Sequence, residues 1–174
     1  TVNRKEYLQR FVSEWISTKS TTANSTLIVA DDGSSDGTLK WLEEEIDLQN
    51  SRLIVIRNNG RGIARQTNSI LDVISKMGID VDAIFMCNDD IRFLNSGWDE
   101  KYFQAMQSSG FDHLVYFNPN WKEPSHSEKS QGNGNLVSSC TPREAMGCFY
   151  TLTPGLIEKL GFFDELSFPV RGHS

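Results

Sequence analysis

Long hydrophobic runs are missing from this 174-residue sequence. No apolar stretch approaches the roughly 20 residues that a membrane-spanning helix requires. The first residues, Thr1-Val2-Asn3-Arg4-Lys5, do not have the apolar character of a signal peptide. We therefore expect no transmembrane segment.

Cysteine is scarce, which bears on both disulfides and metal sites. The sequence contains three cysteines, Cys87, Cys140 and Cys148, an odd number whose spacing matches no zinc motif. Cys87 and Cys148 lie in apolar runs, as small core residues do. These features favour a reducing, cytoplasmic location.

Positive charge is in deficit. The sequence has 17 Lys and Arg against 23 Asp and Glu, a net charge of −6. Nucleic-acid-binding surfaces are normally basic. We therefore expect no nucleic-acid partner, and the length and 38% hydrophobic content predict one globular domain over residues 1–174.

Apolar periodicity predicts alternating helices and strands. The expected helices cover about 4–17, a segment from near 36, a longer segment from 63 to Gly78, a segment from 98 to about 106, and 154–160. The expected strands cover 26–30, 52–57, 83–87, 113–117 and 145–152. This β-α alternation predicts an α/β protein with a mostly parallel, doubly wound, Rossmann-like sheet flanked by helices.

Local signals also predict how two helices begin. Asn3 with Glu6 resembles a capping box for the first helix. Asp36 is expected to cap the helix that follows the first strand. Residues 118–142, rich in Ser, Asn, Gly, Pro and Lys, predict a long flexible loop. Because the first element is a helix and the C-terminal residues contain no terminator, we expect a chain truncated at one or both ends.

Two acidic turns follow two of the expected strands. Asp31 and Asp32 come directly after the strand 26–30, and Asn88-Asp89-Asp90 follows the strand 83–87. Ligands of open α/β sheets bind at the carboxyl ends of the strands. Carboxylate oxygens are preferred ligands of hard cations. The sequence therefore predicts a site for a cation and a phosphorylated ligand.

Five short motifs in a fixed order carry a resemblance to a known family. They are Thr1-x-Asn3-Arg4, Asp31-Asp32-Gly33-Ser34-Ser35-Asp36-Gly37-Thr38, Arg57-Asn58-x-Gly60, Asn88-Asp89-Asp90 and Gly161-Phe162-Phe163-Asp164-Glu165. Each motif alone is a weak indication of a family. All five in this order, in this β-α context, are a strong one. The chain resembles the inverting, family 2-like nucleotide-sugar glycosyltransferases with the GT-A fold.

The resemblance implies a metal-dependent transfer, with inversion, from a nucleotide-diphosphate sugar donor to a hydroxyl of a saccharide or other acceptor. A UDP-type donor is favoured, because the first acidic turn of such enzymes binds uracil and ribose. This role falls on Asp31 and Asp32, with Thr1 at the neighbouring strand end. The second acidic cluster is similar to the family's Asp-x-Asp motif, so Asp89 and Asp90 are expected to hold Mn²⁺ or Mg²⁺ against the diphosphate.

The copy of that motif in this chain begins with Asn88, a neutral and weaker ligand than aspartate. Asn88 and Asp89 are expected to face the donor, while Asp90 carries most of the metal binding. Arg61 and Arg65 open the helix after the Asn-Asn-Gly turn, where they are expected to contact the donor's base or phosphates.

Inverting transfer also needs a base that takes the proton of the acceptor hydroxyl. The family places it slightly beyond the Gly-x-Phe-Asp-Glu segment, where this chain stops. Asp164, Glu165 and His173 are the candidates within the chain.

Two alternatives remain open from the sequence. One is a nucleotide-binding domain without turnover, suggested by Asn88 and the missing base. The other is a calcium-binding structural domain, because Asp32 to Glu43 fits the pattern of an EF-hand loop. An EF-hand needs a helix before its loop, whereas 26–30 is predicted as a strand.

Overall fold

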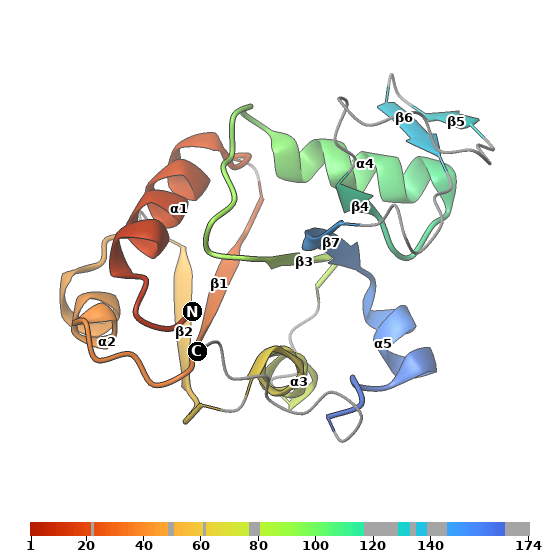
Figure 1. Cartoon of the computed structure of the whole chain (residues 1–174). Helices are drawn as coiled ribbons and strands as arrows, with labels where there is room; N and C mark the ends of the chain where they lie inside the picture. Colours follow the sequence, from red (N-terminus) through yellow and green to blue (C-terminus); the bar gives the residue numbers. More distant parts are fainter. Residues whose placement is uncertain are drawn as a thin grey trace.

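The structure is a computed structural model, and it describes residues 1–21, 23–48, 51–60, 62–76, 81–116, 129–132, 135–138 and 146–165. The helices are α1 (Lys5–Thr18), α2 (Thr38–Lys40), a π-helical turn (Trp41–Glu45), α3 (Gly62–Lys76), α4 (Trp98–Ser109) and α5 (Pro154–Leu160). The strands are β1 (Thr26–Asp31), β2 (Arg52–Arg57), β3 (Ile84–Cys87), β4 (Val115–Tyr116), β5 (Lys129–Gly132), β6 (Asn135–Ser138) and β7 (Met146–Leu152). Figure 1 shows their arrangement.

β1 and β2 form the parallel pair that the β-α alternation predicts. Their register runs from Thr26 opposite Arg52 to Asp31 opposite Arg57, so both strands end at the same edge. The helix that follows β2, α3, lies against β1 beside this edge (Figure 1). The parallel pair therefore delivers the first acidic turn next to the start of α3.

The second group of strands is antiparallel. β7 lies between β3 and β4 and runs antiparallel to both, with Cys87 opposite Phe149. The prediction of one mostly parallel sheet is therefore wrong for the described residues, in which only β1 and β2 pair in parallel. The β-α alternation ends before the long segment that precedes β7, so it does not predict the direction of that strand. β5 and β6 form a separate antiparallel hairpin within the expected loop 118–142, whose other residues, and Cys140, lie outside the described parts.

The main core joins α1 to both groups of strands. Its buried members are Leu8, Phe11, Val12, Trp15, Val29, Trp41, Leu42, Leu48, Phe93 and Phe149. The four from α1 recur at helical spacing and form one apolar stripe. Cys87 and Cys148 pack against this core, as predicted. Burial raises the pKa of the Cys87 thiol, which keeps it protonated.

The predicted helices and strands agree with the structure to within a few residues, but the predicted capping box is wrong. α1 begins at Lys5 with Arg4 at the cap position, and no side chain caps it. Asn3 instead has a positive φ of 49°, and its Oδ1 accepts from the Ser35 N–H at 2.7 Å. The side chain expected to cap α1 therefore ties the chain to the turn after β1.

Asp36 lies one residue before the cap position predicted for it, which Gly37 takes, but its side chain still contacts the start of the helix. Its Oδ1 accepts from the Thr38 N–H at 3.0 Å and from the Thr38 hydroxyl at 2.6 Å. The hydrogen bond from the Thr38 hydroxyl is the main reason that the pKa of Asp36 is lowered. Gly37 takes the left-handed cap position, with a φ of 85° that favours glycine.

The structure contradicts the calcium-loop alternative. The residues before the loop form β1, where an EF-hand requires a helix. Glu43, which would supply the bidentate calcium ligand, forms an ion pair with Arg57 of β2 instead. Within the described ranges, no helix has both the length and the apolar character needed to cross a membrane.

Candidate donor and metal site

The first acidic turn is built around Asp31, which has no exposed surface. Its Oδ1 accepts from the N–H groups of Gly33 and Ser34 at 3.0 and 2.9 Å, and its Oδ2 accepts from the Ser34 hydroxyl. Hydrogen bonds to a carboxylate are stronger than those between neutral groups. Asp31 therefore fixes the shape of the turn, and its predicted contact with a donor base stays a prediction.

Thr1 lies beside the end of β1, where the sequence places it. Its carbonyl accepts from the Asp32 N–H at 2.9 Å, and its nitrogen donates to the Ala30 carbonyl at 2.8 Å. These bonds continue a parallel ladder past β1. Thr1 is also close enough to Asp89 for electrostatic interaction, so it lies between the two acidic turns.

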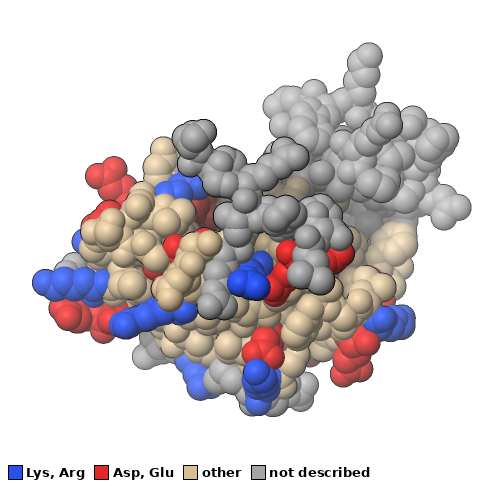
Figure 2. Space-filling view, turned by 60° about the horizontal axis from the view of Figure 1, so that its bottom comes forward, with Lys and Arg blue, Asp and Glu red and all other residues tan. Residues whose placement is uncertain are grey.

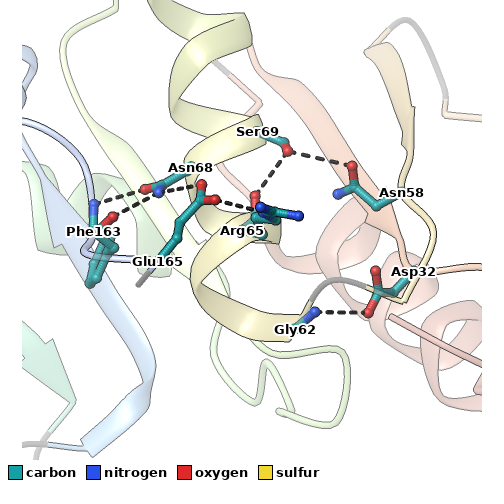
Figure 3. Close-up of polar contacts among 8 residues, drawn as sticks. All are labelled: Asp32, Asn58, Gly62, Arg65, Asn68, Ser69, Phe163 and Glu165. Atoms are coloured by element: carbon teal, nitrogen blue, oxygen red, sulfur yellow. Dashed lines mark hydrogen bonds and ion pairs between the residues drawn. The ribbon is translucent and has the colours of Figure 1, made fainter. Parts of the chain in front are cut away.

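Asp32 connects the first turn to α3. Its Oδ2 accepts from the N–H of Gly62, the first residue of α3, at 3.3 Å (Figure 3). A carboxylate at a helix N-terminus interacts favourably with the helix dipole. Arg61, the predicted donor contact just before this helix, lies outside the described residues.

The residues on either side of the second acidic turn carry aromatic rings that pack against one another. Phe93 stacks on Trp98 with ring centroids 4.4 Å apart, and Phe85 meets Trp98 edge to face at 5.1 Å. At the strand end, the Asn88 N–H donates to the Cys148 carbonyl at 2.9 Å. This packing holds the backbone on both sides of Asp89 and Asp90 in place.

The carboxylates of the second turn share one cation, Arg4. Its Nη1 lies 2.9 Å from Asp89 Oδ1, and its Nη2 lies 3.0 Å from Asp90 Oδ2. The hydrogen bond to Asp90 raises the pKa of Arg4, so the guanidinium stays charged. Arg4 belongs to the first of the five motifs, but its role could not be predicted, because no local pattern indicates a partner 86 residues away.

The residues on either side of Arg4 are anchored to the first turn. The Asn3 N–H donates to the Ser34 hydroxyl at 2.9 Å, and the Lys5 N–H donates to Asp36 Oδ2 at 2.9 Å. Arg4 thus reaches from a backbone fixed to the first turn across to the second. The sequence predicts that both acidic turns lie at one sheet edge, whereas β1 and β3 belong to separate sheets in the described residues. Arg4 links the two turns instead.

The second turn has the chemistry of a divalent-cation site. Asp89 Oδ2 is buried and has no hydrogen-bond partner among the described residues, while the side chain as a whole is 10% exposed. Buried polar atoms are normally partnered, so an orphaned carboxylate oxygen points to a missing ligand. No cluster of three or more His, Cys, Asp or Glu suited to a metal occurs in the described parts of the chain. Two carboxylates suffice for Mg²⁺-like ions, which take further ligands from water and substrate phosphates.

A separate polar cluster joins α3 to residues 161–165 (Figure 3). Asn68, which is buried, accepts from the Phe163 N–H at 2.8 Å and donates to the Phe163 carbonyl at 2.9 Å. Its Nδ2 also donates to Glu165 Oε1 at 2.8 Å, and the Arg65 Nε donates to Glu165 Oε2 at 2.6 Å. We name Arg65, Asn68, Phe163 and Glu165 the α3 clamp.

The α3 clamp places two predicted site residues together, in a way that the sequence did not indicate. Arg65 and Glu165, assigned to the donor and to base catalysis, form an ion pair with each other. An acceptor hydroxyl would therefore have to compete for the Glu165 oxygens. Asp164 is exposed beside the clamp, and His173 lies outside the described residues. The base stays a prediction.

Charge on the surface is mixed rather than concentrated. Figure 2 shows Lys and Arg interspersed with Asp and Glu among the described residues of one face, with no patch of a single sign spanning it.

A scan against protein-family models matches residues 1–161 to the model "Glycosyl transferase family 2". The chain belongs to glycosyl transferase family 2. Among curated proteins, it is 29% identical over 140 residues to the "Uncharacterized glycosyltransferase R363" of Acanthamoeba polyphaga mimivirus. The match covers 80% of this chain and 52% of the relative, so the chain spans about half of that protein's length.

Solved structures of similar fold include S. aureus TarS residues 1–349, with a TM-score of 0.67, 16% identity, and coverage of 95% of this chain and 49% of TarS 1–349. Another is the mannosyltransferase PcManGT from Pyrobaculum calidifontis, solved in complex with GDP-Man and Mn²⁺. Its TM-score is 0.61 at 15% identity, covering 95% of this chain and 46% of PcManGT. The expected α/β class and GT-A fold are thereby confirmed.

Proposed function

We propose that this chain is the donor-binding domain of a metal-dependent family 2 glycosyltransferase. It binds a nucleotide-diphosphate sugar across the two acidic turns and transfers the sugar, with inversion, to a hydroxyl of a saccharide or other acceptor. The observation that carries this proposal is that Arg4, whose neighbours Asn3 and Lys5 are hydrogen-bonded to the first turn, bridges the two carboxylates of the second turn. Membership in the family supports the reaction class.

Asp89 and Asp90 would hold Mn²⁺ or Mg²⁺, with Asn88 beside them on the donor side. Such a cation neutralises the negative charge that develops on the departing diphosphate. Asp32 and Thr1 lie beside the end of β1. They would contact the nucleoside, since carboxylates accept from imide N–H groups and ribose hydroxyls. Asp31 would contribute by holding the turn in place.

A UDP-type donor is favoured by the resemblance of the first acidic turn to those that bind uracil. Calorimetric titration of UDP, GDP and dTDP, each with and without Mn²⁺, tests this assignment. We expect UDP to bind more tightly than GDP or dTDP, and only when Mn²⁺ is present. Binding of GDP, and not of UDP or dTDP, would leave the proposed metal site in place and change the proposed nucleotide of the donor. No binding of any of the three would contradict the proposed function.

A donor-binding domain without turnover is a second candidate, because both Glu165 oxygens are occupied within the α3 clamp. The two functions differ in turnover. Metal-dependent release of UDP from UDP-sugars, in the presence of mixed acceptors, favours the enzyme. Tight binding with no release favours the second candidate.

A further inference from the structure

The charge balance of the second acidic turn depends on one side chain, and that side chain is partly exposed to water. Arg4 is the positive charge that bridges Asp89 and Asp90. Its side chain is 37% exposed and that of Asp90 is 43% exposed, so water reaches the ion pair between them. Exposed ion pairs contribute little to stability.

The backbone around Arg4 is fixed while its side chain is long. Asn3 and Lys5 are held on the first turn by hydrogen bonds from their N–H groups. The guanidinium also lies 4.7 Å from the centre of the Tyr7 ring, a contact favourable to a cation. Arg4 therefore contacts Tyr7 and both carboxylates at once, and because its backbone is anchored, displacement of the guanidinium does not require the chain to move.

Asp89 is satisfied on one oxygen only. Its Oδ1 pairs with Arg4, whereas its Oδ2 is buried and finds no partner in the part of the chain that the structure describes. A guanidinium placed between two carboxylates supplies one positive charge and leaves this acceptor unused. A divalent cation supplies two charges and takes several oxygens at once.

We propose that Arg4 is an exchangeable internal counter-cation of the metal site: it neutralises Asp89 and Asp90 before the divalent cation binds, and the cation displaces it. This inference rests on the proposed function, because it takes Asp89 and Asp90 as metal ligands. It adds that Arg4 competes with the metal and so weakens metal binding in the absence of a donor. Binding of the donor then gives the displaced guanidinium a new anion, the diphosphate, to pair with.

The first test is titration of Mn²⁺ alone into the full chain, followed by the paramagnetic resonance signal of free Mn²⁺. Arg4→Gln removes the competing charge and should bind Mn²⁺ about three- to tenfold more tightly, as expected for the loss of two partly exposed ion pairs. Arg4→Lys, which keeps the charge but not the fork that reaches both carboxylates, should fall between Arg4→Gln and the wild type.

Lys5→Gln is the matched control, because it removes one positive charge from the neighbouring residue without a side-chain contact to Asp89 or Asp90. We expect it to leave Mn²⁺ affinity unchanged. Equal tightening by Lys5→Gln would overturn the proposal, since it would reduce the effect to general electrostatics. Unchanged or weaker Mn²⁺ binding by Arg4→Gln, or no Mn²⁺ binding by either protein, would overturn it as well.

A second measurement observes the displacement in the wild-type protein. Saturating Mg²⁺ should shift the side-chain Nε–H signal of Arg4 in ¹⁵N spectra, assigned by its loss in Arg4→Lys. The signal of Arg57, which pairs with Glu43 away from the second turn, should stay in place. An Arg4 signal that does not move contradicts displacement. If UDP still binds with Mn²⁺ in that case, only this inference fails; if UDP does not bind, the proposed function fails too.

Discussion

The two acidic turns use the same residue type for opposite purposes. In the first turn, both oxygens of Asp31 accept from N–H and hydroxyl groups within three residues along the chain. In the second turn, Asp89 and Asp90 both pair with one distant side chain, Arg4, and the buried Oδ2 of Asp89 has no partner within the described ranges. A carboxylate surrounded by local donors builds the loop, whereas one that depends on an exchangeable cation is available to a ligand.

The largest expected effect is on stability, from Asp31→Ala. This change leaves three donors of the first turn without their buried acceptor, and we expect the free energy of unfolding to fall by about 3 kcal/mol. Urea denaturation measures the loss. Asp90→Ala, the same substitution in the second turn, should change it by less than about 1 kcal/mol. Equal destabilisation by the two variants would remove the distinction between the turns.

A smaller loss of stability is expected from Asn68→Ala. This change tests whether the α3 clamp, like the first turn, is held together by the hydrogen bonds of one buried side chain. Asn68 makes three hydrogen bonds with Phe163 and Glu165, donating two and accepting one. Its loss should lower the free energy of unfolding by about 2 kcal/mol and speed amide exchange in residues 161–165. Unchanged exchange there, beside the matched exposed change Ser75→Ala, would show that the clamp does not hold this segment.

The smallest effect concerns Asp36, an exposed member of the first turn. Because its pKa is lowered in the folded state, its contribution to stability is present above the unfolded pKa of about 3.9. That contribution is lost as the pH falls through the lower folded value. Asp36→Asn should therefore flatten the stability profile below about pH 4, by under about 1 kcal/mol. Identical acid profiles would contradict a role for this carboxylate.

Local patterns predicted the elements well, because they depend on residues close in sequence. The stripe of α1 and the bounded apolar run of β1 fix those elements at the expected positions. The order of β3, β7 and β4 was not predictable, because the direction of β7 depends on pairings across more than sixty residues, as with Cys87 and Phe149.

Within the site, the sequence indicated which turns meet but not which carboxylates are available. Asp31 and Asp89 both follow buried strands, so the pattern treats them alike. Their difference comes from Ser34 and Gly33 in one case and from Arg4 in the other. The latter contact, and the pairing of Arg65 with Glu165, arise only when distant segments fold together.

The central claim is that Asp90 and its neighbour bind a metal that in turn binds the donor. The measurement that tests it most directly is the calorimetric affinity of UDP, with and without Mn²⁺, for Asp90→Ala and for Asp72→Ala. Asp72 is the matched control, a carboxylate with one cationic partner, Lys76, on the surface of α3. The account predicts Mn²⁺-dependent UDP binding in the wild type and Asp72→Ala, and at least about a tenfold loss, or 1.4 kcal/mol, in Asp90→Ala. UDP binding that is indifferent to Mn²⁺, or equal in the two variants, would contradict it.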